Sequence, residues 1–374
     1  MRIALTHPFC WPYVRRGAER FIAEFAGYLV QRGHEVITIS SKPGKSIVEA
    51  TPAGRRILHR QLWTPFLSRF RITPAHAFAA SLGCSLASLR VDVVHSLSYF
   101  DAWMANGLRS WKGYRTVYQV TGPPVPHWFP RIPPDRYVIR SAIHHSDRCM
   151  VHSEFTGRIL RETYGVDARV IPVPIDLNAF PQKTGSGPER ATILAMASFD
   201  DRRKGLRVLI DAFRIVKRNV PEALLVLSGH MSPELRDEVI ERLPTDVRTN
   251  IEVLGVGDIG GVPRLYREAS LTVLPSMWEA YGMSILESWA SGTPVVVTNH
   301  AGLPELVDDS TLGLTFDPLT NGQETRNAEG LAAAIVQALP LAYDPMTARR
   351  CRAKAEGYSW ELLGPQYEAL YAPG

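Results

Sequence analysis

Two glutamates at a fixed spacing mark the segment of the chain that is best suited to chemistry. Glu279 and Glu287 are separated by seven residues, and Gly282 stands three places after the first of them. The apolar run at 271–274 predicts a buried parallel strand that stops at Pro275. We therefore expect a short loop that carries Glu279, followed by a helix that opens near Gly282.

This order of elements suits a ligand that carries phosphate. At the carboxyl end of a strand in an open α/β sheet, a helix amino terminus offers free amides and a positive dipole to a phosphate. Gly282 lets the backbone come close to such a ligand because it has no Cβ. One glutamate can then reach sugar hydroxyls, and the other can accept hydrogen bonds from ribose hydroxyls. The segment therefore predicts a nucleotide-sugar site.

The same segment resembles the E-x7-E signature of retaining GT-B glycosyltransferases of family 4. The match extends to Pro275-Ser276 before it and to Ala301-Gly302-Leu303-Pro304-Glu305 after it. A lone pair of glutamates on a helix would be weak evidence, whereas this context, spanning roughly residues 190–320, is specific. The resemblance implies an α/β chain of GT-B architecture, with two Rossmann-like doubly wound domains facing across a cleft.

The resemblance also implies roles for individual side chains. Glu279 would hold the donor sugar near the reacting carbon, and Glu287 would bind the ribose. Lys204 matches the family's phosphate-binding lysine and would stabilise the charge that grows on the leaving diphosphate. The other donor-binding residues expected from the resemblance are Gly17, Arg203, Gly282, Met283 and Ser284.

Some positions depart from the family's pattern. Arg16 precedes Gly17 where the family usually has a second glycine, and Thr121 stands in place of a histidine beside the donor sugar. Thr121 can hydrogen-bond a sugar hydroxyl but cannot supply an imidazole. His95 ends another strand and is an alternative sugar contact, although such a histidine is more often a structural hydrogen-bonder.

The chain reads as two successive α/β series. The first begins with a strand at 3–6, a helix at 17–32 and a strand at 35–39, and the second begins with a strand at 192–196. Segment 181–188 is polar and rich in Gly and Pro, which is typical of a linker.

These series predict two domains, as expected for 374 residues. An N-terminal, acceptor-binding Rossmann-like domain covers residues 1–180, and a C-terminal, donor-binding one covers 181–357. By resemblance, a crossing helix at 358–374 returns to the first domain.

Composition narrows the class of protein. A hydrophobic content of 45% with 21% charged residues is ordinary for a globular protein. The four cysteines include no C-x-x-C pair, which favours reduced thiols in the cytoplasm over a disulfide framework or a zinc site. No signal peptide is recognisable, since the first strand follows Met1-Arg2 directly.

The net charge of +5 is unevenly distributed. Residues 1–180 hold 23 Lys and Arg against 12 Asp and Glu, a net +11, whereas residues 181–374 hold 19 against 25, a net −6. A basic first half favours an anionic partner, and the segment at 55–71 mixes arginines with bulky apolar residues as interfacial membrane segments do. Nucleic acid is the least expected partner, because no binding motif accompanies the charge.

We therefore expect a cytoplasmic, metal-independent retaining glycosyltransferase that needs no cofactor and contacts the inner face of the membrane peripherally. A UDP-sugar is the favoured donor, with GDP-mannose next, and the acceptor is a glycan, a lipid-linked molecule or a small molecule. Two alternatives stay open: a non-catalytic GT-B protein that binds a nucleotide sugar or partners an enzyme, and a GT-B epimerase or phosphorylase. The only support for the first alternative is Thr121 together with the turn at Val173-Pro174-Ile175-Asp176, which departs from the family's Asn-Gly-x-Asp.

Overall fold

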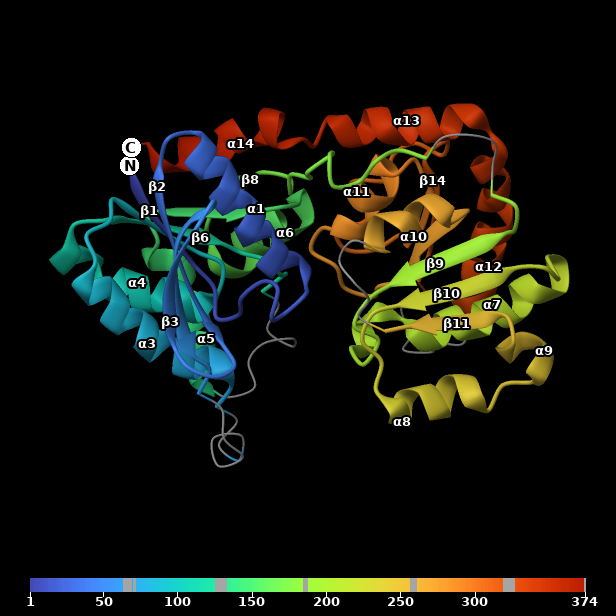
Figure 1. Cartoon of the computed structure of the whole chain (residues 1–374), viewed down its shortest axis with the longest axis horizontal. Coiled ribbons are helices and arrows are strands. Elements are labelled where there is room, and N and C mark those ends of the chain that lie inside the picture. Colours follow the sequence, from blue (N-terminus) through green and yellow to red (C-terminus); the bar gives the residue numbers. More distant parts are fainter. Residues whose placement is uncertain are drawn as a thin grey trace. The chain divides into compact units, whose positions relative to one another are not determined.

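The chain folds into two compact units, each built around its own sheet (Figure 1). Unit 1 comprises Met1–Val173 and Trp360–Gly374, and unit 2 comprises Pro174–Ser359. The sequence placed the corresponding boundaries after residues 180 and 357. The computed structural model describes residues 1–62, 69, 72–124, 133–183, 188–255, 261–318 and 327–372.

Within its described residues, unit 1 holds an eight-stranded sheet in the order β3-β4-β2-β1-β5-β6-β7-β8. Its neighbouring strands are parallel except β3 and β4, which are antiparallel. The strands are β1 (Arg2–Thr6), β2 (Glu35–Lys42), β3 (Ile47–Thr51), β4 (Gly54–Arg60), β5 (Val93–Ser96), β6 (Arg115–Gln119), β7 (Arg148–Val151) and β8 (Arg169–Val170). The helices are α1 (Gly17–Gln31), α3 (Pro74–Ser88), α4 (Tyr99–Lys112), α5 (Pro133–His145), α6 (Glu154–Tyr164) and α14 (Trp360–Glu368), which a 3-10 turn (Ala369–Tyr371) follows.

Helices cover both faces of this sheet. On one face, apolar residues of α3, α4, α5 and α6 pack against the strands in two adjoining clusters. On the other face, Phe25 of α1 stacks on Trp360 of α14, with ring centroids 5.6 Å apart. No helix in the described residues is long and apolar enough to cross a membrane.

The hairpin of β3 and β4 corrects the sequence prediction for the start of segment 55–71. Residues 55–60 lie in strand β4, between β3 and β2, and Leu58 is buried. Arg56 is not a free cation, because its Nη1 lies 3.2 Å from Glu49 Oε1. Most of the remaining segment lies outside the described residues. Strand β4 is stabilised by its pairing with β2 and β3, which the mixture of cations and apolar groups in the sequence does not reveal.

Unit 2 holds a parallel six-stranded sheet in the order β11-β10-β9-β12-β13-β14 within its described residues. The strands are β9 (Thr192–Met196), β10 (Leu224–Ser228), β11 (Ile251–Leu254), β12 (Leu271–Leu274), β13 (Val295–Thr298) and β14 (Gly313–Phe316). The α-helices are α7 (Leu206–Asn219), α8 (Pro233–Arg236), α9 (Thr245–Arg248), α10 (Val262–Glu268), α11 (Met283–Ala290), α12 (Asn327–Ala338) and α13 (Pro345–Glu356). Shorter turns are the 3-10 segments Arg202–Lys204 and Leu339–Tyr343 and the π-helical segment Asp237–Glu241.

Strand β12 shows how the second sheet is covered on both faces. Leu271 and Val273 enter the core cluster that contains the apolar residues of α7 and α12. Thr272 points to the opposite face, where its hydroxyl accepts a hydrogen bond of 2.7 Å from Ser288 of α11. Because alternate residues of a strand face opposite sides, α11 lies across the sheet from α7 and α12. The two units therefore share the doubly wound plan that the sequence predicted.

A buried chain of polar groups joins the C-terminal segment to the first sheet. His152 Nδ1 lies 3.0 Å from the Ile171 carbonyl and must donate to it, so His152 Nε2 accepts from the Gln119 amide at 3.0 Å. Gln119 Oε1 then accepts from His95 Nε2 at 2.9 Å, and His95 Nδ1 accepts from Tyr371 at 2.8 Å. Burial lowers the pKa of His95 to about 3 and that of His152 to about 4, so both rings are neutral at pH 7.

This polar chain predicts that the protein loses stability in mild acid. The pKa of each histidine rises to about 6.5 on unfolding, so the unfolded chain binds more protons below that pH. Between pH 6.5 and 5 we expect each histidine to lower the free energy of unfolding by about 1.4 kcal/mol per pH unit. Urea unfolding of the His95→Asn variant should show a shallower pH slope than the wild type. The exposed His144→Asn variant is the control, and an unchanged slope in His95→Asn would contradict a neutral buried ring.

Candidate functional site

The candidate residues of unit 2 gather where the strand order of the sheet reverses. The chain passes from β9 through β10 to β11 at one edge, and then returns to β12 on the other side of β9. In open α/β sheets, ligands bind beyond the carboxyl ends of the strands at such a switch point. Lys204 follows β9 and Glu279 follows β12, so the topology of the sheet brings their two loops together.

Lys204 and Glu279 form an ion pair at this switch point. Lys204 Nζ lies 2.5 Å from Glu279 Oε2, and the two side chains are 27% and 23% exposed. An ion pair with this much solvent contact adds little to stability. Its significance is that a cation and a carboxylate from two separate loops are held within reach of the same ligand.

Close backbone contacts hold the loop after β9 against the loop after β12. The Met277 amide donates to the Arg203 carbonyl at 2.7 Å, which ties this loop to the loop after β12. Gly205 adopts a left-handed φ of +67°, and a Cβ at this position would lie 2.2 Å from the Pro275 carbonyl oxygen. Only glycine therefore allows the two backbones to come this close, and Lys204 reaches Glu279 as a result.

Arg203 has a partner within its own loop. Its Nε donates to both oxygens of Asp201, at 2.9 and 3.0 Å, and its Nη2 lies 2.5 Å from Asp201 Oδ2. Burial alone would raise the pKa of Asp201, but the hydrogen bonds and charge of Arg203 outweigh burial and lower this pKa. The predicted donor contact thus lies in the expected loop, with its guanidinium oriented by a carboxylate.

The amino terminus of α11 faces the same switch point. Gly282 precedes the helix with a left-handed φ of +92°, and a Cβ there would lie 2.7 Å from Leu303 Cδ2. Met283 and Ser284 form the first turn, at positions whose amides have no acceptor inside the helix. The Glu279 carbonyl accepts from the Gly302 amide at 3.1 Å, which fixes the loop just before this turn. Free amides and the ion pair therefore lie beside one another.

Glu287 lies farther along α11 and is held from a neighbouring helix. It is the fifth residue of the helix and is only 7% exposed. The hydroxyl of Tyr266, a fully buried residue of α10, donates to Glu287 Oε2 at 2.5 Å. Burying a carboxylate is costly unless it is hydrogen-bonded, so Tyr266 stabilises and orients Glu287. The sequence analysis did not assign a role to Tyr266, because nothing in its spacing indicates a hydrogen bond to Glu287.

A further contact joins the loops after β9 and β10, and the sequence did not predict it. Asp200 accepts from the Ser232 amide at 3.0 Å and from His230 Nδ1 at 2.8 Å. The pKa of Asp200 is lowered, with the hydrogen bond from Ser232 as the largest cause. This contact fixes the neighbouring loop at the carboxyl edge of the sheet.

The predicted residues of unit 1 occupy the carboxyl edge of its own sheet. Gly17 opens α1, and the preceding Arg16 binds Glu19 Oε1 at 2.8 Å. Thr121 follows β6, and its side chain lies 3.5 Å from the Leu97 carbonyl. His95 is fully buried and both of its ring nitrogens are hydrogen-bonded, which favours the structural role over sugar contact.

Two family profiles match most of the chain. The profile of glycosyl transferases group 1 matches residues 190–340. The profile of glycosyltransferase family 4 matches residues 15–179. The two matches fall on unit 2 and unit 1 respectively, apart from the last six residues of the second match, 174–179.

Individual proteins show the same similarity. The phosphatidyl-myo-inositol mannosyltransferase of Propionibacterium freudenreichii subsp. shermanii is 25% identical, over 99% of this chain and 94% of its own. Sucrose-phosphate synthase of Thermosynechococcus elongatus shares the fold with a TM-score of 0.82 at 21% identity, over 99% of this chain and 98% of its own. HepE of Anabaena, solved in complex with UDP-glucose, shares it with a TM-score of 0.75 at 18% identity, over 99% of both chains.

The close approach at Gly205 leads to a stability prediction. A Gly205→Ala variant must strain a left-handed residue and push the Pro275 carbonyl away, and should lose about 1–3 kcal/mol of unfolding free energy. Gly27 is a matched control inside α1, because a Cβ there meets nothing within 4 Å. We expect Gly27→Ala to raise stability by up to about 1 kcal/mol. Equal effects of the two variants in chemical denaturation would rule out a special constraint at Gly205.

Proposed function

Because the chain belongs to the group 1, or family 4, glycosyltransferases, we propose that it transfers a sugar from a nucleotide diphosphate sugar with retention of anomeric configuration. The observation that carries this proposal is the ion pair of Lys204 and Glu279 beside the amino terminus of α11. The cation and the free helix amides suit the diphosphate and the negative charge that grows on it during transfer. The carboxylate suits the sugar hydroxyls.

The diphosphate is bound by a lysine and by backbone amides at the start of a helix. Lys204 moves from Glu279 to the phosphate oxygens, which the amides of Met283 and Ser284 also approach at the positive end of the helix dipole. Charge-assisted hydrogen bonds of this kind strengthen as the bond to the sugar breaks, because negative charge then accumulates on the phosphate. They therefore stabilise the transition state more than the bound donor.

The transfer step needs positioning more than a protein base. The bond between the anomeric carbon and the phosphate oxygen breaks, and an acceptor oxygen bonds to that carbon on the face the diphosphate is leaving. The acceptor proton passes to the departing phosphate oxygen, so atoms and charge balance without a side-chain base. Glu279, released from Lys204, accepts hydrogen bonds from sugar hydroxyls and holds the anomeric carbon in place. Glu287, held by Tyr266, accepts from the ribose hydroxyls.

A UDP-sugar is the proposed donor, with GDP-mannose second, and the acceptor is a glycan, a lipid-linked molecule or a small molecule. HepE was solved with UDP-glucose, and the relative from Propionibacterium is a mannosyltransferase named for a lipid substrate. Peripheral contact of the basic first half with an anionic membrane belongs to the same proposal.

A panel of nucleotides tests the donor class directly. Thermal unfolding should be followed with UDP, GDP, ADP and dTDP and their sugar conjugates, because a ligand at 100 times its dissociation constant stabilises by about 2.7 kcal/mol. Turnover of the preferred donor should then be unchanged by EDTA if transfer is metal-independent. A donor isomerised without an acceptor, or turnover that requires phosphate, would instead indicate the epimerase or the phosphorylase.

Removal of Lys204 should weaken diphosphate binding selectively. In Lys204→Ala, calorimetry should show nucleoside diphosphate affinity falling by about 1.5–3 kcal/mol, with nucleoside affinity almost unchanged. The control is Lys217→Ala, which removes a lysine from the last turn of α7, and this variant should bind as the wild type does. Equal weakening of nucleoside and diphosphate would count against a phosphate contact.

Removal of the charge of Glu279 should separate binding from transfer. In Glu279→Gln, transfer should fall by at least about a hundredfold, because the sugar loses the acceptor that positions it. Affinity for the free diphosphate should stay the same or rise, because Lys204 no longer has a competing partner. The control is Glu252→Gln, an exposed residue of β11. A parallel loss of diphosphate binding in Glu279→Gln would exclude the proposed division of roles.

A further inference from the structure

Three neighbouring helices of unit 1, α3, α4 and α5, expose no carboxylate. Helices α3, α4 and α5 contain two acidic residues, Asp101 and Asp135, which are 0% and 3% exposed. Asp135 Oδ1 lies 3.1 Å from His76 Nε2. Burial raises the pKa of Asp101 well above its ordinary value. The outer surface of these three helices therefore presents no exposed acidic side chain.

The same surface exposes large aromatic side chains and arginines. Trp103 and Trp111 of α4 are 38% and 70% exposed, and Tyr137 of α5 is 70% exposed. Arg136 and Arg140 of α5 are exposed and have no carboxylate partner among the described residues. We call these five residues the aromatic face. Soluble proteins rarely expose several large aromatic groups on adjoining helices unless the surface binds something.

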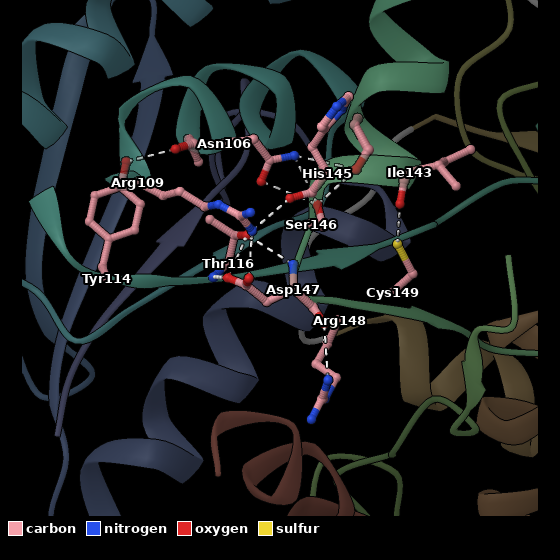
Figure 2. A network of polar contacts seen from close by, with 12 residues as sticks. Asn106, Arg109, Tyr114, Thr116, Ile143, His145, Ser146, Asp147, Arg148 and Cys149 are labelled. Atoms are coloured by element: carbon pink, nitrogen blue, oxygen red, sulfur yellow. Dashed lines mark hydrogen bonds and ion pairs between the residues drawn. The ribbon is translucent and has the colours of Figure 1, made fainter. Parts of the chain in front are cut away.

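Hydrogen bonds show that α4 and the end of α5 are neighbours. Figure 2 shows Asn106 and Arg109 of α4 reaching the end of α5: Asn106 Nδ2 lies 3.1 Å from Ser146 Oγ, and Arg109 Nη1 lies 2.8 Å from the His145 carbonyl. Both helices follow strands of the parallel sheet and run in the same direction. Trp103 and Tyr137 are each the fifth residue of their helix, so they lie near the carboxyl edge of the sheet.

The charge around this face is complementary to an anionic surface. Unit 1 holds 23 Lys and Arg against 13 Asp and Glu, a net +10, whereas unit 2 holds 19 against 24, a net −5. The exposed carboxylate of Asp147, which follows α5, is paired with an arginine, because Arg109 Nη1 lies 2.5 Å from its Oδ1 (Figure 2). Positive potential is therefore concentrated in the unit that carries the exposed aromatic residues.

We propose that the aromatic face docks on an anionic lipid bilayer. Tryptophan and tyrosine rings settle at the headgroup level, where one part of the ring is apolar and the other is wet. Arg136 and Arg140 bind lipid phosphates. This surface differs from segment 55–71, whose first residues form strand β4. The docking deepens the proposed function, on which it rests for one consequence: an acceptor carried by the bilayer, presented at the carboxyl edge of the first sheet.

Vesicle cosedimentation without any nucleotide tests the docking alone. Wild-type protein should bind vesicles of phosphatidylcholine with phosphatidylglycerol, more weakly as salt rises, and should bind phosphatidylcholine alone poorly. Trp103→Ser/Trp111→Ser/Tyr137→Ser and Arg136→Glu/Arg140→Glu should each lower the partition coefficient by about tenfold or more. Unchanged binding in both variants would overturn the proposal, as would the absence of wild-type binding.

Two control variants separate the face from general surface properties. Tyr343→Ser/Leu362→Ser removes exposed apolar residues elsewhere, and Arg218→Glu/Arg349→Glu makes the same charge change in unit 2. Both controls should bind vesicles as the wild type does, and a loss equal to that of the test variants would overturn the proposal. So would a dimer that dissociates in the aromatic variant while vesicle binding is absent, since the face would then join two copies.

A second readout keeps this test apart from the proposed function. Brominated lipids should quench wild-type tryptophan fluorescence more than that of Trp103→Phe/Trp111→Phe, and equal quenching would contradict docking through these rings. Thermal shifts with nucleotides should be unchanged in every face variant. If the wild type binds no nucleotide, the proposed donor site is contradicted, whereas the vesicle-binding result still decides the docking proposal.

Discussion

The close approach of two backbones at the β9–β12 switch point is the constraint on which the candidate site depends. Adjacent parallel strands bring their carboxyl ends together, but the loops that follow them meet only because Gly205 has no side chain facing the Pro275 carbonyl. That contact places Lys204 against Glu279, and the Met277–Arg203 hydrogen bond secures it. The close approach of the two backbones thus determines where the side chains of Lys204 and Glu279 lie.

In unit 1, a buried series of hydrogen bonds fixes the C-terminal turn on the sheet. Neutral histidines, a glutamine and a tyrosine form a directed series of hydrogen bonds from the C-terminal turn to the Ile171 carbonyl. The Ile171 carbonyl can only accept, so it sets both histidine tautomers, and the hydrogen bond between Tyr371 and His95 ties the C-terminal turn to β5. Hydrogen bonds require specific distances and angles, whereas apolar packing tolerates small shifts. The buried polar series therefore specifies where the C-terminal turn lies on the sheet.

Much of the framework could be predicted from local patterns. The apolar runs at β9 and β12 have the bounds that the sequence predicted, and the helix opens at Gly282 as expected, because strand length and glycine position are local properties. The hairpin of β3 and β4 was missed because its residues alternate weakly and carry several cations. Tyr266 and Glu287 are 21 residues apart, and only the packing of α10 beside α11 brings them together. The ion pair could not be predicted either, since the family resemblance assigns each partner to a ligand and says nothing of a contact between the two side chains.

The ion pair has a consequence for the end of the proposed reaction. A donor supplies sugar hydroxyls to Glu279 as it withdraws Lys204, so both ions keep partners. The diphosphate that is left after transfer still binds Lys204, but it offers nothing to Glu279 and adds its own negative charge beside that carboxylate. Re-formation of the Lys204–Glu279 contact competes with the spent nucleotide for the same cation. In the proposed reaction, re-formation of the ion pair therefore favours release of the spent nucleotide diphosphate.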